Sequence, residues 1–293
     1  MAWKKEKTEE QLEAEKQRDI DKELRRSDSK GKDTAKTHGE ILREQINHAK
    51  DTYDKSAQSI FTSSLTAGLE IGFSYLLICT LYFFLIDKVD DSSLIRIVAL
   101  VYPLGFILVV LGQSILFTEQ TALLTLPVLN KKQTIGSMLK LWGIVIVGNL
   151  IGGYIIAGIL LWLGPHLGIF TIDVVVAIAE HVLHPPTTVV FVSAIVAGWL
   201  MGLLSWLLAS SRDTISRIVM IFMITAVMSF TGLHHSIIGS VEVFSGMLSS
   251  PDISLWDYVS FQSTALLGNA FGGAIFVALL KYRAFVFNII SKY

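Results

Sequence analysis

The chain has 293 residues, of which 52% are hydrophobic and only 17% are charged. A mean hydropathy of +0.56 is too high for a soluble domain of this length, so the composition predicts a membrane protein. The formal net charge of −1 gives no basic surface for nucleic acid. A single cysteine, Cys79, excludes a disulfide framework and a paired-cysteine metal site.

The first 55 residues form a polar tail in front of an apolar body. They hold 14 of the 24 Lys and Arg residues and 14 of the 25 Asp and Glu residues. Charged helix formers without an apolar face, as in residues 9–18, fit either a disordered chain or a solvated helix. From about 37 to 61, sparse apolar residues recur at helical spacing, which predicts a short amphipathic helix beneath the first span. A gating role and a simple solvated extension are both open for this tail.

Six apolar stretches are long enough to cross a membrane as helices of about 20 residues. They lie near 61–86, 95–128, 138–163, 187–210, 216–248 and 260–281. The second is interrupted by Gly112, Gln113, Ser114, Thr118, Glu119 and Gln120, and the fifth by Ser229, Thr231, Gly232, His234, His235, Ser236, Gly239 and Ser240. Both are predicted to be broken helices. Free backbone at membrane depth needs protein or a water-filled cavity around it, so two breaks indicate a path for a solute.

An internal repeat relates the two halves of the body. The motif G-N-x-x-G-G occurs at 148–153 and again at 268–273, and Ala-Gly pairs occur at 67–68 and 197–198. Each glycine taken alone fits close helix packing equally well. Because each half has an odd number of spans, the second half must enter the membrane from the opposite side. The predicted fold is therefore all-α, with six transmembrane helices in an inverted 3+3 repeat.

Basic residues in the connections predict the orientation. They are Lys131, Lys132, Lys140, Arg212, Arg217, Lys281, Arg283 and Lys292, whereas the connections 164–186 and 249–259 contain no Lys or Arg. Both termini are therefore expected in the cytoplasm. The predicted organisation is a charged tail (1–55), a multi-pass pore domain (56–285) and a short cytoplasmic C-terminus (286–293).

Several motifs together resemble one known family. They are G-F-I-L-V-V at 105–110, L-F-T at 116–118, G-N-L-I-G-G at 148–153, G-L-H-H-S-I at 232–237 and G-N-A-F-G-G at 268–273. These motifs are similar to those of the formate/nitrite transporter family, over roughly residues 40–285. The resemblance implies a homopentamer in which each protomer has its own pore in an aquaporin-like arrangement of spans.

The resemblance also implies roles for individual residues. It assigns the central histidine to His235, the threonine opposite it to Thr118, and the position of a frequent asparagine beside it to Gly198. The apolar constriction is assigned to Phe106, Leu116 and Met228, with Phe230 as an aromatic ring that could substitute for Met228. The family's frequent lysine in the connection between spans three and four is missing. His181 or His184 is expected to replace it, with Glu180 and Glu242 shaping the field at the outer mouth.

His235 is also a functional candidate on its own chemistry, because an ionisable group in a helix break at membrane depth is expensive. Imidazole has an unperturbed pKa of about 6.5, so His235 is expected to be a protonatable group that donates a hydrogen bond to a carboxylate. A weak-acid anion could take up a proton in the dry pore and cross as the neutral acid, which costs far less desolvation. His234 and His235 do not form a metal site by themselves, since neighbouring helical side chains diverge by about 100°.

The function predicted from the sequence is passage of a small monovalent weak-acid anion, such as formate or nitrite, across a bacterial inner membrane. Protons are a possible co-substrate and the lipid bilayer is the surrounding partner. No cofactor, metal or enzymatic activity is expected. One alternative is an aquaporin-like channel for neutral solutes, which the absence of N-P-A motifs disfavours. The other is an intramembrane enzyme using His234, His235 and Glu242, for which no nucleophile or metal pattern is present.

Overall fold

The computed structural model describes residues 9–26 and 35–290. All elements in these ranges are helices, so the all-α prediction is confirmed. They are α1 Glu9–Arg26, α2 His38–Asp54, α3 Ala57–Leu85, α4 Asp91–Val98, α5 Pro103–Leu111, α6 Phe117–Leu123, α7 Thr125–Leu129, α8 Ile135–Leu167, α9 Ile172–Leu183, α10 Thr187–Ser210, α11 Thr214–Phe230, α12 Ser236–Ser249, α13 Leu255–Phe271, a π-helical segment Gly272–Leu279, and α14 Leu280–Ile290.

Five helical stretches in the described part are long and apolar enough to cross a membrane. They are 57–85, 91–111, 135–167, 187–210 and 255–288, and two shorter apolar helices, α11 and α12, accompany them. The chain is thus a multi-pass membrane protein. The last stretch is longer than the predicted 260–281, because α13, the π-helical segment and α14 follow one another without a gap. The boundary predicted at residue 285 falls inside α14, and residues 291–293 lie outside the described residues.

Both predicted helix breaks are present, and each turns through one residue with a left-handed backbone. The first separates α5 from α6 and contains Gln113 with a φ of 58°. The second separates α11 from α12 and contains Gly232 with a φ of 67°. The first break is shorter than expected, since Thr118 and its two successors lie inside α6. The second is also shorter, since Ser229 belongs to α11 and the residues from Ser236 onward belong to α12.

A buried asparagine holds the first break in place. The side chain of Asn149, in α8, accepts a hydrogen bond from the backbone N–H of Phe117 at 2.8 Å. Its amide nitrogen donates to the carbonyls of Ser64 at 2.7 Å and Ile115 at 2.9 Å. One side chain therefore satisfies backbone groups at the start of α6 and in the break, where no helical partner is available.

Asn269, in α13, does the same for the second break. It accepts from the backbone N–H of Ser236 at 2.8 Å and donates to the carbonyls of Ala194 at 2.7 Å and His234 at 3.1 Å. Asn149 and Asn269 are the asparagines of the two G-N-x-x-G-G motifs. Equivalent contacts at equivalent motif positions are what an internal repeat predicts.

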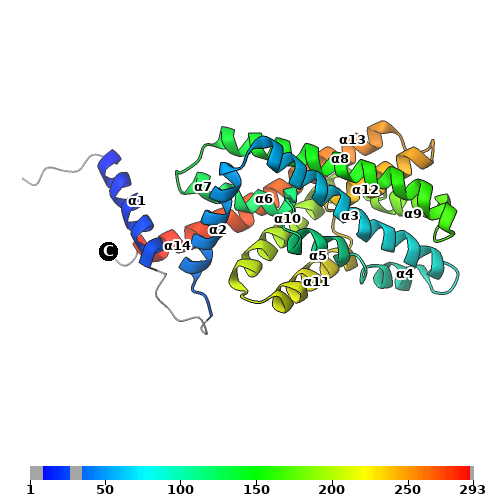
Figure 1. Ribbon diagram of the computed structural model, residues 1–293, viewed down its shortest axis with the longest axis horizontal. Coiled ribbons are helices and arrows are strands. Elements are labelled where there is room, and N and C mark those ends of the chain that lie inside the picture. The colour runs from blue at the N-terminus through cyan, green and yellow to red at the C-terminus, as the bar shows by residue number, and fades with distance from the viewer. Residues whose placement is uncertain (1–8, 27–34, 291–293) are drawn as a thin grey trace, which may run out of the picture.

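The polar tail contributes two helices that lie with α14 at one end of the molecule, while α4 and α9 lie at the opposite end (Figure 1). The predicted amphipathic helix is α2, which buries Ile41, Leu42 and Ile46. A side-chain amide of α2, that of Gln45, donates to the carbonyl of Ser205 at 2.9 Å. Helix α1 joins the loop after α7 through salt bridges at 2.8 Å from Lys131 to Glu13 and from Lys132 to Asp21.

Candidate functional site

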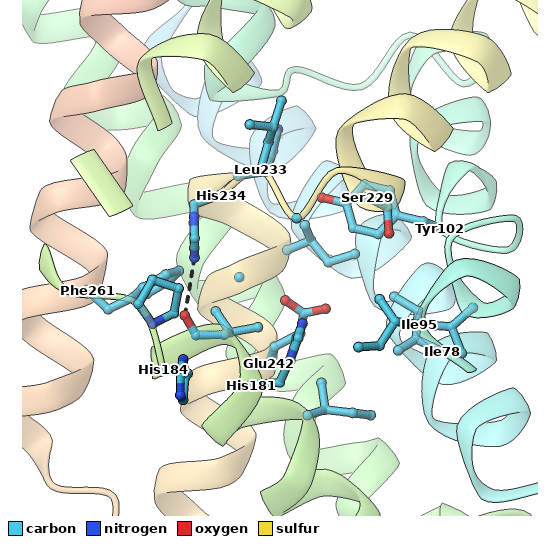
Figure 2. A pocket seen from close by; sticks show the side chains of 18 of the residues that line it. Ile78, Ile95, Tyr102, His181, His184, Ser229, Leu233, His234, Glu242 and Phe261 are labelled. Carbon is cyan, nitrogen blue, oxygen red and sulfur yellow. Dashed lines mark hydrogen bonds between the residues drawn. The ribbon is translucent and has the colours of Figure 1, made fainter. Parts of the chain in front are cut away.

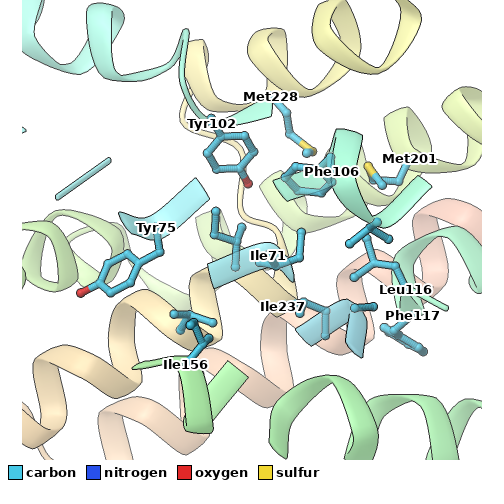
Figure 3. Close-up of a cluster of buried hydrophobic side chains, with 14 of the residues drawn as sticks. Ile71, Tyr75, Tyr102, Phe106, Leu116, Phe117, Ile156, Met201, Met228 and Ile237 are labelled. Carbon is cyan, nitrogen blue, oxygen red and sulfur yellow. The ribbon is translucent and has the colours of Figure 1, made fainter. Parts of the chain in front are cut away.

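The breaks meet at a dense apolar cluster. Phe106 of α5, Leu116 at the start of α6 and Met228 of α11 are fully buried in one hydrophobic cluster. Figure 3 shows Phe106 and Leu116 near Met201 and Met228. Phe230 does not join them, because it lies on the protomer surface with 53% of its area exposed. The expectation that Phe230 lies at the constriction is therefore wrong, since two residues along a helix turn the side chain to another face.

His235 is the buried polar residue beside this cluster. It caps the N-terminus of α12, and its Nδ1 accepts a hydrogen bond from the backbone N–H of Ile237 at 3.2 Å. Its Nε2 lies 2.8 Å from the hydroxyl oxygen of Thr118. The edge-to-face ring of Phe106 lies 5.0 Å away between centroids. His235, at the end of the second break, and Thr118, in the first turn of α6 after the first break, thus meet.

These contacts define the tautomer of the imidazole. A backbone N–H can only donate, so Nδ1 of His235 must be the unprotonated acceptor. In the neutral ring the hydrogen is therefore on Nε2, which donates to Thr118. A second proton on Nδ1 would face the N–H of Ile237 and break this cap. The arrangement therefore favours the neutral ring, and the hydroxyl hydrogen of Thr118 has no acceptor within the described part of the chain.

A cavity of about 340 Å³ opens from His235 toward the end of the molecule that carries α4 and α9. Figure 2 shows residues that line it, among them Tyr102, His181, His184, His234, Glu242 and Phe261. Among the described residues of this lining, none is Lys or Arg. Glu242, expected near the outer mouth, lies in the buried wall of the cavity with 8% of its area exposed. We call this space the outer cavity.

His234 has both ring nitrogens occupied. Its Nδ1 lies 2.8 Å from the hydroxyl of Ser193, which also accepts the backbone N–H of His234 at 3.0 Å. Its Nε2 lies 3.2 Å from the carbonyl oxygen of Val182 and donates to it. His234 therefore ties the second break to α9 and α10. The sequence could not predict this role, because its partners Ser193 and Val182 lie on other helices.

The other residues expected at the mouth lie farther out. His181 and His184 are exposed at the rim of the outer cavity. Glu180 is also exposed, but it lines a separate hollow together with His184, Asp252 and Trp256. Of the four residues expected at the mouth, His181, His184 and Glu242 therefore face the outer cavity, and Glu180 does not.

A second cavity of about 300 Å³ lies toward the end that carries α2. Its charged and titratable lining residues are Glu44, His48, Lys55, Glu119 and Arg217. Desolvation, and next the charge of Lys55, lower the pKa of His48, which favours its neutral form. We call this space the inner cavity. Helix α2 lines part of it, and Arg217 was recognised in the sequence only as a sign of orientation.

Gly198 packs against the backbone of Asn269 and has no room for a side chain. A Cβ atom on Gly198 would lie 2.2 Å from the backbone oxygen of Asn269. A Cβ atom on Gly68 would likewise lie 2.2 Å from the backbone oxygen of Asn149. Both glycines allow two helices to approach closely. An asparagine at position 198 could not fit without displacing α13.

Within residues 9–26 and 35–290, no group of three or more His, Cys, Asp or Glu side chains is arranged to hold a metal ion. The arrangement offers instead one buried hydrogen-bonding pair, His235 and Thr118, between two cavities that open toward opposite ends of the protomer. Such a geometry suits passage of a small solute past an apolar constriction.

Comparisons with known proteins agree with this geometry. The family model described as formate/nitrite transporter matches residues 39–283. The inner membrane protein YfdC of Escherichia coli (strain K12) is 32% identical over 238 residues, which cover 78% of this chain and 73% of that protein. A solved structure described as an FNT family ion channel has a TM-score of 0.75 at 23% identity and covers 83% of this chain and 98% of that chain.

A second solved structure, described as a pentameric formate channel with formate bound, has a TM-score of 0.67 at 21% identity. It covers 78% of this chain and 98% of that chain. Both structural likenesses concern the fold, while the family match extends over most of the sequence. The chain therefore belongs to the formate/nitrite transporter family.

Proposed function

We propose that each protomer passes a small monovalent weak-acid anion, formate or nitrite, between the inner and outer cavities. The observation that carries this proposal is the contact of His235 with Thr118, a buried polar side-chain pair beside the Phe106 constriction. Family membership supports the same substrate class. Other relatives are named as transporters and channels, so transport rather than an enzymatic reaction is the activity proposed.

Chemistry favours a weak acid over a strong-acid anion at this constriction. A bare anion among buried phenylalanine, leucine and methionine side chains would lose its hydration without a compensating charge. The neutral acid can cross with one hydrogen bond from Nε2–H of His235 and one from the hydroxyl of Thr118. A neutral-solute channel of aquaporin type remains the alternative against which this proposal is tested.

The decisive experiment measures flux in proteoliposomes that contain the purified protein. Labelled formate and nitrite are expected to enter at least about tenfold faster than chloride or glycerol, a difference of about 1.4 kcal/mol in barrier height. Entry should increase as the external pH falls, because more substrate is protonated. Fast glycerol or water flux without formate flux would contradict the proposal.

We also propose that the protein is a homopentamer in a bacterial inner membrane. The outer face of α8 exposes Val147, Ile151 and Ile155, which need lipid or a neighbouring protomer as cover. Native mass spectrometry in mild detergent is expected to give five copies of the chain, as in the formate channel whose fold it shares. A monomer that transports at the full rate would contradict this assembly.

The end that carries α1, α2 and α14 is proposed to face the cytoplasm. Lys131, Lys132 and Arg217 gather at this end, whereas the rim of the outer cavity contains His181 and His184. An excess of Lys and Arg marks the cytoplasmic side of membrane proteins.

A further inference from the structure

We propose that Glu242 is the proton donor of the outer cavity: its carboxylic acid hydrogen-bonds the incoming weak-acid anion and protonates it before it reaches His235. This inference rests on the proposed transport of a weak acid and specifies where its proton comes from. The group that acts on the incoming anion is then a buried carboxylic acid and not an exposed charge at the outer mouth.

The position of Glu242 is the first argument. It lies on α12, whose first turn is capped by His235, so the carboxyl group and the imidazole line the same cavity. The side chain is 8% exposed, and no hydrogen bond joins its carboxyl group to another described residue. Figure 2 shows its carboxylate among the side chains that line the outer cavity. A buried carboxyl group without a partner, facing a cavity of about 340 Å³, has room for a small ligand.

The second argument is that neither central histidine has a proton to give. Neutral His235 carries one hydrogen, on Nε2, and loss of that hydrogen would create an imidazolate. Neutral His234 uses its one N–H on the carbonyl of Val182. A second proton on either ring would sit on Nδ1, which already accepts a hydrogen bond, and would break that bond. The carboxyl group of Glu242 is the acid in the cavity that can release a proton and become a stable anion.

The groups that face Glu242 are compatible with this task. Its charge reaches Tyr75 and Cys79 of α3 and Tyr102 before α5. The remaining titratable groups of the lining are Tyr82 of α3, His181 of α9, His184 directly after α9, and His234 and His235 of the second break. No Lys or Arg of the described lining neutralises the carboxylate. An ionised Glu242 would therefore repel an arriving anion, whereas the protonated acid would bind it.

The proton transfer balances without another reactant. The O–H bond of the Glu242 carboxylic acid breaks as an O–H bond forms on the substrate carboxylate or nitrite oxygen. The neutral acid then moves past Phe106, and it releases the proton to water in the inner cavity. The Glu242 carboxylate regains a proton from the outer solution, for which the exposed imidazoles of His181 and His184 lie at the rim.

The test measures labelled formate entry and internal acidification in the same proteoliposomes, with a potassium ionophore to compensate charge. A positioned proton donor contributes roughly 100-fold or more to a transfer step. Glu242→Gln keeps the shape and a hydrogen-bond donor but cannot give up a proton. We expect it to lower formate entry and the accompanying proton entry together by about 100-fold, because only the neutral acid passes the constriction. Glu242→Asp should retain most of the flux.

Asp252→Asn is the matched control, because it makes the same carboxyl-to-amide change at an exposed outer position that does not line this cavity. It is expected to behave like the parent. Formate entry in Glu242→Gln at the rate of the parent would overturn the proposal for Glu242. Absence of formate flux in the parent would instead overturn the proposed function.

A measurement on the unaltered protein covers the case in which Glu242→Gln does not fold. A hydrophobic carbodiimide modifies protonated carboxyl groups inside membranes, and peptide mass spectrometry locates the modified residue. We expect modification of Glu242 to stop proton entry and excess formate to slow the modification. Proton entry that continues after Glu242 has been modified would contradict its role as donor.

Discussion

Replacing Asn269 by leucine is expected to prevent the protein from accumulating in a folded, assembled form. The change leaves the N–H of Ser236 and the carbonyl of His234 without their partner. Each unpaired buried group costs about 1–3 kcal/mol, and two together reach a large part of the stability of a typical protein, about 5–15 kcal/mol. Asn149→Leu should be equally damaging, because Asn149 bonds the N–H of Phe117 and the carbonyl of Ile115 at the first break.

Gln262→Leu is the matched control for these variants. Gln262 is a buried amide on α13, the helix that also carries Asn269, but neither of its polar side-chain atoms has a hydrogen-bond partner in the described chain. Its replacement should leave stability unchanged or improve it. Yield and melting temperature in detergent, measured by size-exclusion chromatography with fluorescence detection, distinguish the cases. A melting temperature of Asn269→Leu within about 2 °C of the parent corresponds to a stability loss of less than about 1 kcal/mol. Such a result would contradict the conclusion that the asparagine holds the break in place.

The sequence was sufficient to predict the breaks and the pairing of motifs. Polar residues and glycines interrupt two apolar stretches, and no simple helix can bury them in lipid without a cavity. The two copies of G-N-x-x-G-G were also visible. The purpose of the asparagines was not, because a motif gives spacing along one helix while the groups that Asn149 and Asn269 satisfy come from other helices.

The sequence was less informative about which face of an apolar helix meets the pore. In a soluble helix the polar face marks the solvent side, but the last turns of α11 before the break are mostly apolar, so the pattern there does not show which face meets the pore. Phe230 was misplaced for this reason, because it lies on the outer surface. The burial of Glu242 was also not apparent from the sequence, because it depends on α9 and α3 packing around it.

The contact between Thr118 and His235 leads to a prediction that separates hydrogen bonding from titration. Thr118→Val keeps the shape of the side chain but leaves Nε2–H of His235 without its acceptor. A cost of about 1–3 kcal/mol corresponds to roughly a tenfold to hundredfold loss of formate flux. Thr125→Val is the matched control, since the hydroxyl of Thr125 bonds to the carbonyl of Thr121 and contacts the sulfur of Met138, away from the lining of both cavities. It should transport like the parent.

His235→Asn should lower formate flux by a similar or larger factor while the protein still assembles, because asparagine is also a good N-cap for α12. The double variant should lose little more than His235→Asn alone, since the two residues share one hydrogen bond. If Glu242 is the titrating group, the pH profile of the remaining flux keeps its shape in His235→Asn and flattens in Glu242→Gln. A profile that flattens in His235→Asn instead would make the central histidine the proton carrier, and the neutral tautomer held by Ile237 would then not be the working state.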